Sequence, residues 1–189
     1  PHKNGLGESR REHLKVPEAP VSGTLDLAKM PLVIDLRGTI HGNEISGAQG
    51  LLSLMYYYAA SEDPAVTEML ENTVLLVVPA QNPDGMSRFA MWVNGNASIH
   101  PFLDNQAREY HEPSPSSRAN HYWMDTNRDW LTAQYPEGKN LVTMYEYWMP
   151  NVLLDLHEMG SSRSGLYYFS PGDPNRNFAH IPPSKPDLT

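Results

Sequence analysis

The sequence predicts an α/β fold with a mixed, mostly parallel sheet that carries helices on both faces. Three apolar runs, Leu32–Leu36, Thr73–Val78 and Val152–His157, have the β-branched and leucine-rich composition of buried parallel strands. A helical pattern over Ile45–Ala60 separates the first two strands, and the runs end in polar residues. Strands that alternate with helices are typical of a sheet covered on both faces, with ligand chemistry at its carboxyl edge.

The remaining elements follow from local signals. Asp63 before Pro64 predicts an N-cap followed by proline at the first helical position, so a short second helix begins there. Asn82–Gly85 (NPDG) has the composition of a turn that shapes a loop. Met86–Ser117 is long and polar with few periodic signals, which predicts a loop that is functional or forms a lid. A last helix is expected over Leu141–Met149, before the third strand.

Length and composition indicate one domain of ordinary size. The chain has 189 residues, of which 40% are hydrophobic, enough for a substantial core. Residues 1–30 are charged, punctuated by proline and without a clear period, so we expect a tail or surface segment there. We therefore assign residues 31–189 to a single domain.

Charge and cysteine content exclude several classes of protein. The formal net charge is −8 and no basic stripe is present, so we expect no nucleic-acid partner. There are no cysteines, which leaves His, Asp and Glu as the strong metal ligands. No apolar run reaches the roughly 20 residues of a membrane span. Because the chain begins at Pro1, a leader could already have been removed, and we expect a secreted or periplasmic protein.

Two strand ends carry residues that bind metals. His41 and Glu44 follow the first strand, and His157 ends the third. Because the carboxyl ends of parallel strands meet at one edge, these side chains are expected to lie close together. Catalytic zinc commonly takes three protein ligands and keeps one position for water. A lone His-x-x-Glu often arises by chance, and a lone histidine at a strand end is usually capped or solvated. Two such ends, together with the motifs described next, favour one zinc ion.

Four short motifs occur in a fixed order along the chain. They are His41–Glu44 (HGNE), Asn82–Gly85 (NPDG), Asp125–Trp130 (DTNRDW) and Asp155–His157 (DLH). In order and context they resemble the M14 family of zinc carboxypeptidases, over about residues 32–170. Each motif alone is weak, but four in order are specific. Their variants are more similar to a bacterial branch than to the digestive enzymes.

The resemblance implies a carboxypeptidase-like fold in which His41, Glu44 and His157 hold one zinc ion. It also implies that Asp125 orients the first zinc histidine, a role that suits a carboxylate on the far ring nitrogen. The alternative for Asp125 is a loop residue that makes an Asx turn. Asp155 shares a strand face with His157 and could support that ligand, but an aspartate paired elsewhere explains it equally well.

The resemblance further implies a site for a peptide that ends in a free carboxylate. Asn127 and Arg128 match the pair that grips this carboxylate, which the planar arginine fork binds in a bidentate manner. Arg118 is expected to polarise the scissile carbonyl and stabilise the oxyanion. Arg88 is the competing candidate for that role, and a solvated surface charge is the alternative for either arginine.

One part of the family mechanism has no counterpart in the sequence. The family uses a glutamate general base well downstream of the third ligand. The single glutamate after His157 is Glu158, which is adjacent to the ligand and points the other way on a strand. We therefore expect residues 31–189 to be the N-terminal part of a catalytic domain that is incomplete at its C-terminus.

The expected function is a zinc-dependent metallocarboxypeptidase that removes C-terminal residues from peptides. One alternative is an M14-like amidohydrolase that acts on N-acyl amino acids or cell-wall peptides with the same zinc site and a different pocket. The other is a non-catalytic pseudo-peptidase that binds peptides without turnover, which the missing glutamate would favour if the chain were complete.

Overall fold

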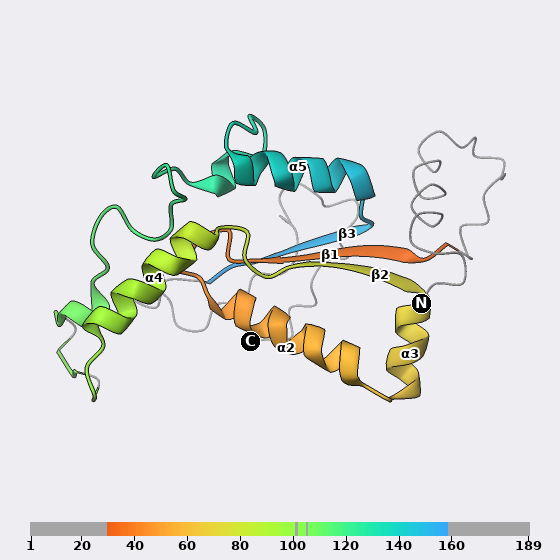
Figure 1. Cartoon of the computed structure of the whole chain (residues 1–189), viewed down its shortest axis with the longest axis horizontal. Coiled ribbons are helices and arrows are strands. Elements are labelled where there is room, and N and C mark those ends of the chain that lie inside the picture. The colour runs from red at the N-terminus through yellow and green to blue at the C-terminus, as the bar shows by residue number, and fades with distance from the viewer. Residues whose placement is uncertain (1–29, 101, 105, 159–189) are drawn as a thin grey trace, which may run out of the picture. The chain divides into compact units, whose positions relative to one another are not determined.

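The computed structural model describes residues 30–158, with gaps at 101 and 105. Its centre is a three-stranded parallel sheet in the order β2-β1-β3 (Figure 1). The strands are β1 (Leu32–Gly38), β2 (Thr73–Val78) and β3 (Val152–Leu156). The α/β prediction is confirmed, and the described strands all pair in parallel. The predicted segment 1–30 lies outside the described residues, apart from its last residue.

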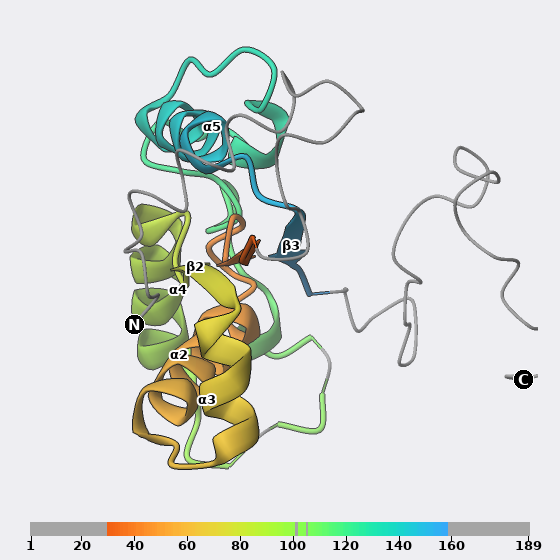
Figure 2. The same ribbon diagram turned by 90° about the vertical axis from the view of Figure 1, so that its right-hand side faces the viewer.

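Among the residues that the structure describes, four α-helices and two short 3-10 helices accompany the sheet. The α-helices are α2 (Ser46–Ala60), α3 (Pro64–Glu71), α4 (Pro83–Asn96) and α5 (Pro136–Trp148), and the 3-10 helices are η3 (Arg108–Tyr110) and η4 (Thr126–Arg128). Helix α5 lies on one face of the sheet and α2 on the other, as two perpendicular views show (Figures 1 and 2). None of the described helices is long and apolar enough to cross a membrane.

The apolar core lies between the sheet and α5. Val33, Val74 and Leu76 are almost completely buried and form one cluster. Met144 and Trp148 of α5 pack against this cluster. Because these side chains leave water together, their burial is the main contribution to holding α5 on the sheet.

The opposite face of β1 approaches α2 very closely. A Cβ atom at Gly38 would lie 3.0 Å from the carbonyl carbon of Gly47 and 3.2 Å from the Leu51 side chain. The helix can approach this closely because both strand and helix carry glycine at the contact. Helix α2 therefore begins directly beside the carboxyl end of β1.

The prediction of a loop from Met86 was wrong as far as Asn96, because α4 occupies Pro83–Asn96. The Asn82 side chain accepts a hydrogen bond from the backbone N–H of Gly85 at 2.9 Å, and Pro83 stands in the first turn. The NPDG motif is therefore a helix start, and not only a turn. Asparagine followed by proline serves both structures, and the weak apolar period after it concealed the helix.

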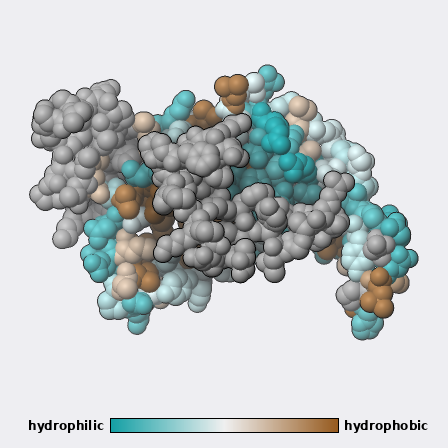
Figure 3. Space-filling model, turned by 180° about the vertical axis from the view of Figure 1, so that it is seen from behind, coloured by the Kyte–Doolittle hydropathy of each residue, from teal (hydrophilic) through white to brown (hydrophobic). Residues whose placement is uncertain are grey.

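Several large apolar side chains are exposed among the described residues. They include Leu52, Met55 and Tyr56 on α2, and Val152 and Leu154 on β3. On the face shown in Figure 3, the visible apolar side chains form separate groups between hydrophilic ones. In the described part of the sheet β3 is an edge strand, so one side of it has no strand neighbour there.

Candidate metal centre

The three predicted metal ligands meet at the carboxyl edge of the sheet. Nδ1 of His41 lies 2.8 Å from Oε1 of Glu44, and Nδ1 of His157 lies 2.8 Å from Oε2 of the same carboxylate. One ligand atom from each residue falls within 4.8 Å of the others. Two imidazole nitrogens and a carboxylate oxygen in this arrangement are a donor set that suits zinc.

The chain after β1 holds His41 and Glu44 on one turn. The backbone N–H of Glu44 donates to the carbonyl of His41 at 3.0 Å, and the Thr39 hydroxyl donates to the carbonyl of Glu44 at 3.3 Å. Between the two ligands stands Gly42, where a Cβ atom would lie 2.1 Å from the carbonyl carbon of Gly85. Glycine is therefore required for the ligand turn to contact the first turn of α4.

Each histidine binds an aspartate with its second ring nitrogen. Nε2 of His41 lies 3.1 Å from Oδ1 of Asp125, and Nε2 of His157 lies 3.0 Å from Oδ2 of Asp155. Histidines that bind a metal commonly make such a contact on the far nitrogen, which fixes the tautomer and increases the basicity of the ligand. The arrangement leaves both Nδ1 atoms directed at Glu44, and it fits a metal held by the three residues.

The cluster perturbs the protonation of its members. Partial burial acts to raise the pKa of Glu44, but hydrogen bonds with His157 and His41 outweigh it and hold this pKa well below its usual range. Hydrogen bonds with Asp155 and Glu44 raise the pKa of His157 to about 10. At neutral pH the metal-free cluster therefore holds an ionised Glu44 and a protonated His157. A metal ion at Nδ1 of His157 has to displace that proton.

Arg118, and not Arg88, lies at the cluster. Nε of Arg118 donates to Oδ2 of Asp125 at 3.0 Å, and its Nη1 lies 3.5 Å from Oε1 of Glu44. The Arg118 side chain remains 41% exposed, so part of its guanidinium is accessible. Arg88 instead stacks 4.2 Å from the ring centroid of Trp123 and donates to three loop carbonyls. Those carbonyls belong to Ser116, Ala119 and Asn120.

The predicted carboxylate-binding pair follows Asp125 on η4. Asp125 accepts a hydrogen bond from the backbone N–H of Asn127 at 2.9 Å, so it caps η4 as well as contacting His41. Asp125 therefore contacts both the backbone of η4 and the His41 ring. Nδ2 of Asn127 lies 3.4 Å from Nε2 of His157, and the exposed Arg128 donates to the carbonyl of Asn127 at 3.1 Å. The pair is therefore adjacent to the cluster.

Comparison with known proteins identifies the family. A family model described as zinc carboxypeptidase (peptidase family M14) matches residues 27–181. The chain belongs to the M14 zinc carboxypeptidase family. The probable carboxypeptidase 2 of Trichophyton verrucosum (strain HKI 0517) is 26% identical over 129 residues, which are 68% of this chain and 20% of that protein. Carboxypeptidase D of Anas platyrhynchos is 28% identical over 122 residues, or 58% of this chain and 9% of that protein.

A shorter match reaches higher identity. Human carboxypeptidase D is 40% identical over 53 residues, which are 27% of this chain and 4% of that protein. The M14 chain spans about a fifth of the length of the fungal relatives that it matches. We therefore state the activity of the whole protein as a proposal. Membership of a bacterial branch stays a prediction.

A buried ion pair behind the M14 site escaped the sequence analysis. Nε and Nη2 of Arg37 donate to Oδ2 of Asp35 at 2.8 and 2.5 Å, and both side chains are 0% exposed. The Arg37 guanidinium lies 5.2 Å from the ring centroid of Trp130 and donates to the carbonyl of Leu141 at 3.4 Å. The pair therefore joins β1 to the end of the DTNRDW segment and to α5. The sequence signal for this ion pair is the presence of two charged residues in an otherwise apolar strand.

Asn82 is a second residue whose role only the structure shows. Its Nδ2 donates to the carbonyls of Ile40 and Arg118, both at 3.2 Å. Its Oδ1 accepts from the N–H of Gly85. One buried amide therefore joins the segment before His41, the start of α4 and the loop that carries Arg118.

Glu158 has a structural partner in this M14 chain. Its carboxylate accepts a hydrogen bond from the backbone N–H of Ser46 at 2.7 Å, at the beginning of α2. Its own backbone N–H donates to Oε2 of Glu44 at 2.9 Å. A carboxylate at a helix N-terminus is favoured by the helix dipole. The Glu158 carboxylate is thus held at the start of α2.

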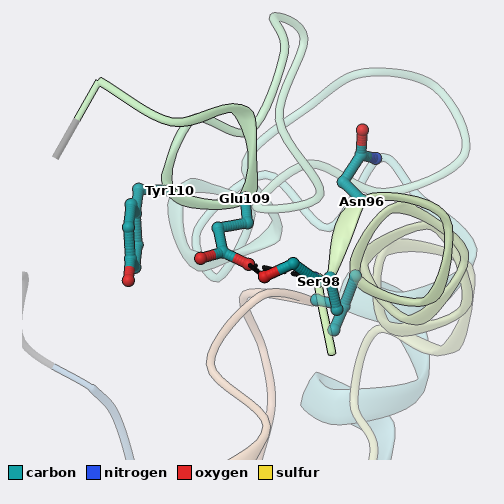
Figure 4. A pocket seen from close by; sticks show the side chains of 6 residues that line it. Asn96, Ser98, Glu109 and Tyr110 are labelled. Carbon is teal, nitrogen blue, oxygen red and sulfur yellow. Dashed lines mark hydrogen bonds between the residues drawn. The ribbon is translucent and has the colours of Figure 1, made fainter. Parts of the chain in front are cut away.

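A pocket of about 250 Å³ lies at the end of α4 (Figure 4). It is lined by Val93, Asn96, Ala97, Ser98, Glu109 and Tyr110, and it contains none of the proposed metal ligands. The Glu109 carboxylate accepts hydrogen bonds from the backbone N–H of Phe102 and from Ser98, which lower its pKa. Because these donors satisfy the Glu109 carboxylate, we infer that its role is structural: it holds the loop that follows α4.

Proposed function

We propose that the protein is a zinc-dependent metallocarboxypeptidase that hydrolyses C-terminal residues of peptides. The observation that carries the proposal is the cluster of His41, Glu44 and His157, with both Nδ1 atoms directed at one carboxylate. In this proposal the three residues hold one zinc ion. Zinc bound by three protein ligands supplies a Lewis acid for the scissile carbonyl and lowers the pKa of a bound water.

The residues around the cluster have separate roles in the proposal. The accessible part of the Arg118 guanidinium polarises the scissile carbonyl and stabilises negative charge on its oxygen. The Asp125 carboxylate holds Nε of Arg118 and Nε2 of His41, so it orients a cation and a ligand together. Asn127 and Arg128 bind the terminal carboxylate beside the cluster.

Proton transfer is not assigned to any of the residues 30–158 that the structure describes. The assignment of residues 31–189 to one catalytic domain, and a secreted or periplasmic location, also stay predictions. The peptide is the proposed partner, since M14 relatives are named carboxypeptidases.

Peptides with free C-termini are expected to be hydrolysed faster than the same peptides with amidated C-termini. Loss of a charge-assisted hydrogen bond costs about 1.5–3 kcal/mol, so the kcat/KM of the full-length protein should fall by roughly 10- to 150-fold on amidation. Arg128→Ala should remove most of this discrimination, and Arg108→Ala, at another exposed arginine, should retain it. Equal hydrolysis of both peptides would contradict the carboxylate-binding role, and turnover of N-acyl amino acids alone would favour an amidohydrolase.

Zinc binding is expected to weaken as pH falls through the neutral range. The pKa of His157 is raised to about 10 in the metal-free cluster, so binding at neutral pH releases a proton from this ring. Exchange of one proton changes the apparent Kd about tenfold per pH unit. Chelator competition between pH 6.5 and 8.5 measures the slope. A Kd that stays constant over this range would show that His157 is not a ligand or is not protonated in the metal-free protein.

A further inference from the structure

We propose that Gln81 is a positioning residue for the third metal ligand, and that it acts through Asp155 on His157. The inference rests on the proposed zinc site. Gln81 lies just beyond the end of β2 and is 5% exposed. No sequence motif pointed to it, because it precedes the NPDG motif and carries no charge.

A continuous series of contacts joins Gln81 to the cluster. Nε2 of Gln81 donates to Oδ1 of Asp155 at 2.8 Å. The other oxygen of Asp155, Oδ2, lies 3.0 Å from Nε2 of His157. Nδ1 of the same ring lies 2.8 Å from Oε2 of Glu44. Both carboxylate oxygens of Asp155 are thus held, so its plane, and the ring that it contacts, have a defined orientation.

The orientation of the Gln81 amide is determined by its surroundings. Besides Asp155, its Nε2 lies 3.4 Å from the carbonyl oxygen of Gly38. Both neighbours are acceptors, so the amide group must present its nitrogen to them. Its Oε1 is buried without a hydrogen-bond partner among the described residues. A buried unpartnered oxygen costs free energy, and a methionine would fill the space without that cost. The donor function toward Asp155 therefore explains the glutamine.

The two histidines differ in how much they need such support. The His41 side chain is 2% exposed, and its own turn and Asp125 surround it. The His157 side chain is 33% exposed and follows β3, the edge strand of the described sheet. A partly exposed ring loses more rotational freedom when it is fixed, so an oriented carboxylate contributes more at His157.

The test measures zinc affinity in the full-length protein by competition with a chelator. Gln81→Met keeps the approximate volume and removes the donor, and we expect zinc affinity to fall about tenfold, since partners of metal ligands typically contribute 10- to 100-fold. The thermal midpoint of the metal-free variant separates this loss from a folding defect. Gln49→Met on the exposed surface of α2 is the matched control and should bind zinc like the wild type.

A double-mutant cycle distinguishes action through Asp155 from a general effect. Asp155→Ala should weaken zinc binding by itself, and Gln81→Met should add nothing further in that background. The inference is overturned if Gln81→Met lowers affinity equally with and without Asp155. Should Gln81→Met not fold, Gln81→Asn shortens the amide by one methylene and is expected to give the same loss. Wild-type affinity in either folded variant also overturns the inference. A wild-type protein without zinc affinity would instead overturn the metal site itself, and this inference with it.

Discussion

Replacement of His41 by alanine is expected to abolish stoichiometric zinc binding. The substitution removes one of three proposed ligands and leaves Glu44 and Asp125 without the ring that both contact. The loss should exceed the roughly 10- to 100-fold effect that removal of an outer partner produces. Elemental analysis after dialysis against a dilute chelator measures the zinc content per chain.

The matched control for this prediction is His121→Ala, because His121 is an exposed histidine outside the cluster. It should retain one zinc ion per chain. The thermal midpoint of each metal-free variant shows whether the fold survives. Unchanged stoichiometric zinc in a folded His41→Ala variant would refute the ligand assignment.

Replacement of Asp35 by alanine is expected to destabilise the protein strongly. The substitution leaves the Arg37 guanidinium at 0% exposure without its carboxylate, and its Nη1 already has no partner among the described residues. Removal of one partner from a buried ion pair typically costs about 3–5 kcal/mol. Because a domain has only about 5–15 kcal/mol of stability, the urea midpoint should fall greatly.

Two further variants test the cause of that loss. Replacing both charges, in Asp35→Leu/Arg37→Met, should recover much of the stability, because apolar residues of similar volume often replace a buried pair without loss. Glu62→Ala removes an exposed carboxylate and should change stability by less than about 0.5 kcal/mol. A cost of under 1 kcal/mol for Asp35→Ala would show that water reaches Arg37.

The ion pair also connects stability to the proposed substrate site. Arg37 lies beneath the ring of Trp130, which closes the segment that carries Asn127 and Arg128. Thr126 of the same segment donates to the carbonyl of Ile40 at 2.9 Å. The segment is therefore attached to β1 and to the chain just after it, close to the turn that presents His41.

Much of the fold was predictable because its signals are local. Thr73–Val78 was predicted with the bounds that the structure has, since a short run rich in β-branched residues favours a buried strand over a helix. The start of α3 at Pro64 was predicted from its cap, and Asp63 does accept the hydrogen bond from the N–H of Ala65. Helix α4 was missed because its cap residues also form turns and its sequence has little apolar period.

The resemblance favoured Arg118 over Arg88 for the oxyanion role, but the sequence shows neither arginine's contacts. Arg88 is occupied by loop carbonyls and the Trp123 ring, whereas Arg118 contacts Asp125 beside the cluster. Arg88 is occupied because the loop at residues 116–120 lies against α4, and a contact between segments so far apart in the sequence leaves no local pattern. The same reason hid Gln81, whose partner Asp155 is 74 residues away in the sequence and lies on β3, which β1 separates from β2.

The strands, the resemblance to the M14 family and the three residues that meet at one edge of the sheet were predictable before the fold was known. These follow from apolar period and from motifs whose residues are neighbours in the chain. The resemblance already implied the Asp125 contact and left Asp155 open, but the Asp155 contact, the Gln81 amide and the Asp35–Arg37 pair became visible only in the folded chain. Hydrogen bonds between distant segments depend on distances of a few tenths of an ångström, which no local pattern specifies.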